Sequence, residues 1–162
     1  MNNCYAMRFL SSFNKQSKSK TEWIRSSRRD CVERIKGSHR RMMENSNTID
    51  DGAWMYDLQI NDAALSAICD RSDDFSDPIE YAAFIIDYVN AFHPFVDGNK
   101  RMSLLLAVQA LGSEGYKLDN SPEVAQFIKD VASGLYDRAE IEAWLRSYLT
   151  RRACGKRPGA LP

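Results

Sequence analysis

The feature that most limits the fold is an apolar segment near the middle of the 162-residue chain. Residues 79–92 are apolar almost all the way round a helix, which predicts a helix that is buried on every side. Asp77 and Pro78 are typical of an N-cap and a first helical position. His93-Pro94 ends the segment, because the residue before a proline is driven away from helical angles. Such a helix needs other elements packed around it.

The other periodic segments predict that most of these elements are helices. Further helices are expected from Thr21 to about Glu44, from Asn61 or Asp62 to Ile68, from Asn99 to about Leu111, from Ser121 to Val131, and from Asp137 or Arg138 to Leu149. Asp51-Gly52 is a hairpin signal and predicts a small β-hairpin flap over residues 48–58. Residues 71–77 read as an acidic loop. The predicted fold class is therefore mostly α, a compact helical bundle with one small β-hairpin.

Charge divides the chain into an acidic body with basic ends. Residues 1–50 carry 11 basic and 5 acidic residues, residues 51–150 carry 7 and 17, and residues 151–162 carry 4 and none. Three parts are expected: a loosely ordered arm at residues 1–20, one domain at residues 21–150, and a disordered basic tail at residues 151–162. Few aromatic residues interleave with the basic ones, so we favour solvated ends over a nucleic-acid-binding arm.

Membrane and secretory signals are missing from the sequence pattern. No apolar run approaches the roughly 18–20 residues that cross a bilayer, and the N-terminus does not resemble a signal peptide. Cys4, Cys31, Cys69 and Cys154 show neither close pairing nor the spacing of metal ligands. We therefore expect free thiols in a reducing cytoplasm, and no membrane partner.

Residues 93–101, His-Pro-Phe-Val-Asp-Gly-Asn-Lys-Arg, concentrate the chemistry of the chain. They form a predicted loop that leads into a helix, and the N-terminus of a helix attracts anions. His93 can accept a proton from a hydroxyl, and Asp97 can hold a Mg²⁺ ion that bridges phosphate oxygens. Lys100 and Arg101 bring positive charge to a phosphate. The natural ligand of such a loop is a nucleotide phosphate.

Each of these residues also has a purely structural interpretation. Gly98 lets the backbone approach a phosphate closely, and Asn99 can cap the following helix, donate to a phosphate oxygen, or do both. His93 could be a core or capping histidine, and Asp97 a turn former. Two cations at a helix N-terminus oppose the helix dipole, however, and this broken local rule favours function.

The same nine residues resemble the signature of the Fic/Doc (Fido) family, H-x-F-x-[D/E]-[G/A]-N-[G/K]-R. Lys100 is the form typical of its Doc, or death-on-curing, branch, and the resemblance extends over about residues 77–150. It implies a Fido-type helical bundle with a small flap, and a transferase that uses ATP and Mg²⁺. It also implies that His93, Asp97, Lys100 and Arg101 are catalytic.

The resemblance further indicates which phosphate is transferred. Family members with glycine at the Lys100 position commonly transfer AMP, whereas members with lysine resemble protein kinases and bind the nucleotide in reverse. Leu104 stands where the AMP-transferring motif has a second arginine. We therefore expect phosphoryl transfer from ATP to a Ser or Thr hydroxyl of a protein. The alternatives are AMP transfer, a non-catalytic nucleotide- or protein-binding Fido module, and a basic-armed nucleic-acid binder.

Partners and regulation also follow from the resemblance. Doc-like toxins imply elongation factor Tu as the target and a small antitoxin as the inhibitor. Glu44-Asn45 is similar to the inhibitory motif [S/T]-x-x-x-E-[G/N] of self-restrained family members, although Arg40 replaces its Ser or Thr. Trp54 and Tyr56 are expected near the flap that docks the target.

Overall fold

The computed structural model describes residues 28–44, 60–119 and 121–154, and its regular structure within these ranges is helical. The elements in chain order are α2 (Arg28–Glu44), α3 (Asp62–Asp70), the 3₁₀ turn η2 (Arg71–Asp74), α4 (Pro78–Phe92), α5 (Asn99–Ser113), α6 (Pro122–Ala132) and α7 (Arg138–Cys154). The predicted mostly helical fold is confirmed. The predicted hairpin at residues 48–58, with Trp54 and Tyr56, and the arm at residues 1–20 lie outside the described residues.

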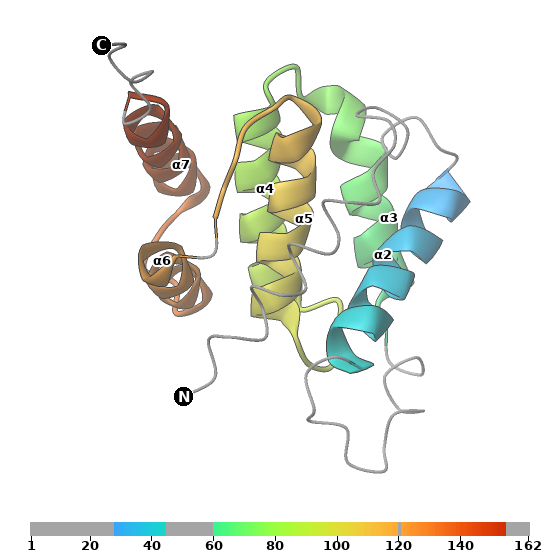
Figure 1. The fold of residues 1–162 in the computed structure, drawn as a ribbon. Coiled ribbons are helices and arrows are strands. Elements are labelled where there is room, and N and C mark those ends of the chain that lie inside the picture. Colours follow the sequence, from blue (N-terminus) through green and yellow to red (C-terminus); the bar gives the residue numbers. More distant parts are fainter. Residues whose placement is uncertain (1–27, 45–59, 120, 155–162) are drawn as a thin grey trace.

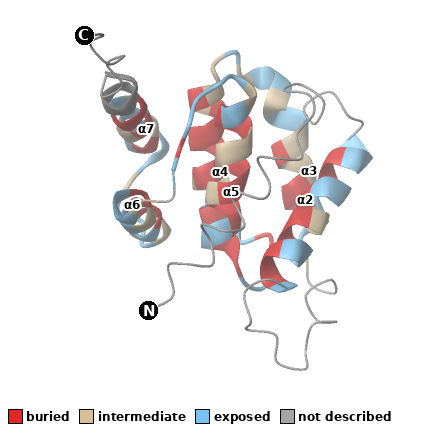
Figure 2. Ribbon diagram, in the orientation of Figure 1, coloured by how far each residue is buried: buried red, intermediate tan, exposed pale blue. Residues whose placement is uncertain are grey.

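Helices α4 and α5 form the centre of the molecule, and the other helices flank them (Figure 1). The Asp77 side chain caps α4 by accepting the Ile79 N–H at 2.8 Å, and Pro78 occupies the first helical position. Most of α4 is buried, as the apolar pattern predicts (Figure 2). A six-residue loop, residues 93–98, connects α4 to α5 and carries most of the motif.

Two apolar clusters share this central pair. One joins α4 and α5 to α2 and α3, with Ile35 and Leu65 among its members. The other joins the opposite sides of α4 and α5 to α6 and α7, with Phe127 and Leu145 among its members. Burying one such side chain stabilises the fold by about 1.5–3 kcal/mol. The loop at residues 93–98 is thus attached to the two helices that contribute to both clusters.

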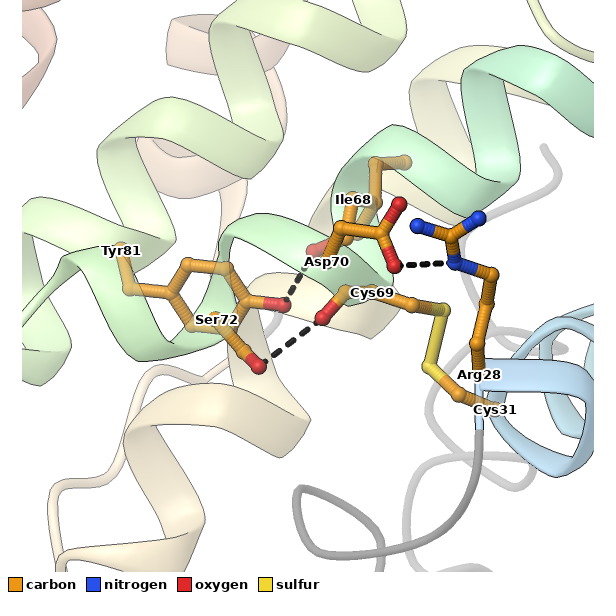
Figure 3. The surroundings of a disulfide bond; sticks show 7 residues. All are labelled: Arg28, Cys31, Ile68, Cys69, Asp70, Ser72 and Tyr81. Carbon is orange, nitrogen blue, oxygen red and sulfur yellow. Dashed lines mark hydrogen bonds and ion pairs between the residues drawn. A yellow bond between two sulfur atoms is a disulfide. The ribbon is translucent and has the colours of Figure 1, made fainter.

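A disulfide between Cys31 and Cys69 links α2 to α3 (Figure 3). The two Cα atoms are 6.1 Å apart, although the residues are separated by 38 positions in the sequence. The expectation of four free thiols is therefore wrong for this pair. Helices α2 and α3 pack side by side, and a spacing of this length gives no sign of that contact. An ion pair between Arg28 and Asp70 lies next to the disulfide.

Local signals at the helix ends are mostly confirmed. Asn61 caps α3 through Ala64 N–H, and Ser121 caps α6 through Val124 N–H. The predicted acidic loop after α3 is instead a 3₁₀ turn over its first four residues, 71–74. Helix α7 continues past Arg151, where we expect the tail to begin, to Cys154.

No helix among the described residues has the length and apolar composition needed to span a membrane.

Candidate active site

His93 is the C-cap of α4 and has a left-handed backbone conformation, with φ 44° and ψ 61°. Its N–H donates to the Val89 carbonyl oxygen at 3.2 Å, which closes the last turn of the helix. Glycine is the usual residue in this conformation, because an L-residue costs roughly 1–2 kcal/mol there. His93 is the one non-glycine residue with positive φ in the described part of the chain, and it is exposed. A strained, exposed histidine on a buried helix is a typical functional position.

Asn99 holds the loop in a closed shape. Its amide oxygen accepts the Phe95 N–H at 3.0 Å, and its amide nitrogen donates to the Phe95 carbonyl oxygen at 2.7 Å. The prediction that Asn99 caps α5 is wrong, since the N-cap is Gly98 and Asn99 is the first helical residue. Both polar groups of the Asn99 amide are instead hydrogen-bonded to the backbone of Phe95, which is buried. Binding of a phosphate by Asn99 stays a prediction.

Helix α2 closes the loop from one side. Gly98 has φ 84°, and a Cβ atom added there would lie 2.7 Å from Met42 Cε and 3.2 Å from Met43 Sδ. Glycine is therefore favoured at this position by its positive φ, and a Cβ atom there would displace the flexible end of Met42. The sequence predicts that Gly98 lets the backbone approach a phosphate. Its positive φ and its contact with α2 are a second reason for glycine at this position.

His39 also belongs to this contact, and the sequence patterns that we used do not identify it. It is buried in α2, and its ring stacks on Phe95 with centroids 4.1 Å apart and an interplanar angle of 11°. Its Nε2 atom lies 2.8 Å from the Asp97 carbonyl oxygen. The available signal is its spacing of four residues from Ile35 and from Met43, which places it on the apolar face of α2.

The charged side chains of the motif lie on the exposed side of the loop. The Asp97 and Arg101 side chains are 64 % and 42 % exposed, and their Oδ2 and Nη2 atoms are 3.8 Å apart. Lys100 is exposed in the first turn of α5, and this turn contains no acidic residue. The dipole of α5 and the two cations therefore all favour an anion at this helix end. One turn further, Leu104 is partly buried against the cluster shared with α6 and α7.

Binding of Mg²⁺ by Asp97 stays a prediction. No group of three or more potential ligand residues suited to a metal ion occurs within the described ranges. Mg²⁺ is commonly bound by one or two carboxylates together with the phosphates of a substrate, so a cage of protein ligands is not required. The single exposed carboxylate of Asp97, beside a predicted phosphate site, fits this mode of binding.

The family is identified by a comparison with protein-family models. The model of the Fic/DOC family matches residues 19–111, which is more than half of the chain. The chain belongs to the Fic/DOC family. The matched range includes α2, α3, α4 and α5 up to residue 111, and therefore the whole motif. No curated protein and no solved structure matches the chain.

Membership of the Fic/DOC family gives the general chemistry. Its members are typically transferases that use a nucleotide, generally ATP, together with Mg²⁺.

Glu44, the candidate inhibitory residue, is the exposed last residue of α2. It directly follows Met43, whose sulfur lies 3.6 Å from Arg101 Nη2. An inhibitory role of Glu44 stays a prediction.

Proposed function

We propose that this Fic/DOC protein transfers a phosphoryl group from ATP to a Ser or Thr hydroxyl of another protein, with His93 as the general base. The observation that carries the proposal is the position of His93 at the end of α4, exposed and next to the cationic start of α5. A base and an anion site held by the same short loop are what transfer of a phosphoryl group to a hydroxyl requires.

The side chains would divide the work according to their chemistry. Arg101 offers a planar guanidinium that can bind two phosphate oxygens at once, and Lys100 offers a mobile point charge. Asp97 would hold Mg²⁺ together with phosphate oxygens, and the ion, when bound, neutralises charge on the transferred group. His93 would take the proton of the attacking hydroxyl.

Two positions favour transfer of the terminal phosphate over transfer of AMP. Lys100 adds volume and charge where the AMP-transferring members have glycine. Leu104 packs against the core at the position of their second arginine, so the chain offers no second guanidinium at that point of α5. The lysine reduces the room, and the leucine reduces the positive charge, available for a nucleotide that enters with its α-phosphate at the loop.

The biological setting is proposed from the Doc resemblance. Lysine at position 100 links the chain to the branch whose members act as toxins on elongation factor Tu and are restrained by an antitoxin. We infer a cytoplasmic toxin of that kind, with a soluble protein as its target. Expression of the protein in bacteria should then slow growth, and the variant described below should not.

The test is a transfer assay with ATP labelled at either the α- or the γ-phosphate, in the presence of Mg²⁺ and a bacterial lysate. The control is His93→Asn, because asparagine tolerates the left-handed conformation but does not replace histidine as a base. A band labelled only by γ-phosphate, and lost in the control, supports the proposal. A band labelled only by α-phosphate means AMP transfer. A protein that binds ATP but labels nothing would be a binding module.

A further inference from the structure

The peptide unit between Asp97 and Gly98 is held at both of its polar ends. Its carbonyl oxygen lies 2.8 Å from His39 Nε2, and its N–H donates to Asp97 Oδ1 at 2.5 Å. We propose that His39 is a positioning residue, which sets the orientation of this peptide and thereby aims the groups that bind the nucleotide phosphate. The inference rests on the proposed function, because that function supplies the phosphate.

The hydrogen bond places a hydrogen on Nε2 of His39. A carbonyl oxygen can only accept, so Nε2 of His39 carries the hydrogen and donates it. The bond is partly buried: His39 is 2 % exposed, whereas Asp97 is an exposed residue. Loss of the donor would remove the His39 partner of this carbonyl oxygen, and the peptide could then rotate to hydrogen-bond with water instead. The bond therefore selects one orientation of the peptide.

This orientation determines where the Gly98 N–H points. In a planar trans peptide the C=O and N–H bonds point in opposite directions. Since the carbonyl of Asp97 is turned toward α2, the N–H of Gly98 is turned away from α2. It meets the Asp97 carboxylate there, beside Arg101. An anion at the start of α5 would meet the same N–H donor.

The ring of His39 is itself held in place. It stacks on Phe95, and the backbone of Phe95 is fixed by both ends of the Asn99 amide. The loop is also anchored to α3, because Asn61 N–H donates to the Pro94 carbonyl oxygen at 2.9 Å. Because the ring is held on both sides, the position of α2 determines the orientation of the peptide between Asp97 and Gly98. A flexible side chain could not hold the peptide in one orientation.

The test compares two substitutions that separate stacking from hydrogen bonding. His39→Phe keeps a ring over Phe95 and removes the donor, whereas His39→Gln offers an amide N–H near the position of Nε2. Ile35→Ala serves as the control, because it weakens the same helix one turn away without touching a motif residue through a hydrogen bond. Initial rates of γ-phosphate transfer would be measured at saturating and at limiting ATP, and stability by urea unfolding.

We expect His39→Phe to lower the rate at saturating ATP by roughly ten- to a hundredfold, because small displacements of catalytic groups have effects of that size. His39→Gln should stay within about threefold of the wild type, and Ile35→Ala should lose stability but not rate. The proposal is overturned if His39→Phe transfers at the wild-type rate, or if His39→Gln is as slow as His39→Phe.

A second measurement separates this proposal from the proposed function. If the wild-type protein transfers no label, phosphoryl transfer is refuted, and the orientation of the peptide is judged from hydrogen exchange of the Gly98 amide by NMR. Faster exchange by about tenfold in His39→Phe, but not in His39→Gln or Ile35→Ala, supports the role of His39. Equal exchange in all four proteins overturns it.

Discussion

The disulfide between Cys31 and Cys69 allows a stability prediction with a calculated magnitude. The two residues are separated by 38 positions, and in the chain-entropy account a link of this span raises the free energy of unfolding by about 4 kcal/mol at 25 °C. A chain of about 160 residues changes its melting temperature by roughly 2–4 °C per kcal/mol. Replacing both cysteines by serine should therefore lower the melting temperature by about 8–16 °C.

The assay is urea unfolding of the wild type and of the Cys31→Ser/Cys69→Ser variant, each with and without a reducing agent. The reductant should destabilise the wild type and leave the variant unchanged. Because the unlinked chain expands further when it unfolds, the slope of the unfolding free energy against urea should rise as well. The control is Cys4→Ser/Cys154→Ser, in which the response to reductant should persist. A loss below about 1 kcal/mol would refute the reasoning and mean that residual structure in the unfolded chain restricts it equally well without the link.

Three further predictions concern single positions. Gly98→Ala should destabilise the protein by about 1–2 kcal/mol because of its positive φ, and the flexible end of Met42 would have to shift. An unchanged urea midpoint would contradict the strain assigned to this position. Asn99→Ala should cost about 2–3 kcal/mol by leaving the buried loop backbone unpaired, and Asn99→Asp, which keeps only the acceptor, should fall between it and the wild type. Burial acts to raise the pKa of Asp77, but its hydrogen bonds, including that from Arg146, outweigh burial and lower it. Folding therefore favours the charged form of Asp77. The resulting stabilisation is present above the ordinary pKa of 3.8 and is lost as the pH falls below it. The urea midpoints at about pH 6 and about pH 3 should therefore differ less in Asp77→Asn than in the wild type.

Features that depend on a few neighbouring residues were predictable from the sequence. The caps at Asn61, Asp77 and Ser121 satisfy backbone N–H groups within three residues of themselves, so the local sequence contains all the atoms involved. The end of α4 at His93 was predictable for the same reason, because the following proline acts on its direct neighbour. The family signature occupies nine consecutive residues, 93–101, and is recognisable for the same reason.

Features that depend on contacts between distant segments were not predictable in this way. The bond from His39 to the Asp97 carbonyl spans 58 positions, and the disulfide spans 38. Both arise because α2 packs against α3 and against the loop between α4 and α5, and a periodic apolar pattern gives the face of a helix but not its partner. The role of Asn99 was misassigned for a related reason: a polar residue at the start of a helix is usually a cap, and here the buried loop backbone competes for its amide.

The motif contains two kinds of residue, and the two kinds should respond differently to substitution. The buried residues hold the loop against α2 and α5: Phe95, Gly98 and Asn99. The exposed residues carry the chemical groups: His93, Asp97, Lys100 and Arg101. Replacing a buried one must cost stability and transfer together, because the same contacts provide both. Replacing an exposed one can remove transfer and leave the free energy of unfolding within about 0.5 kcal/mol of the wild type. If an exposed residue instead proves essential for folding, the division between scaffold and chemistry that the loop displays would have to be abandoned.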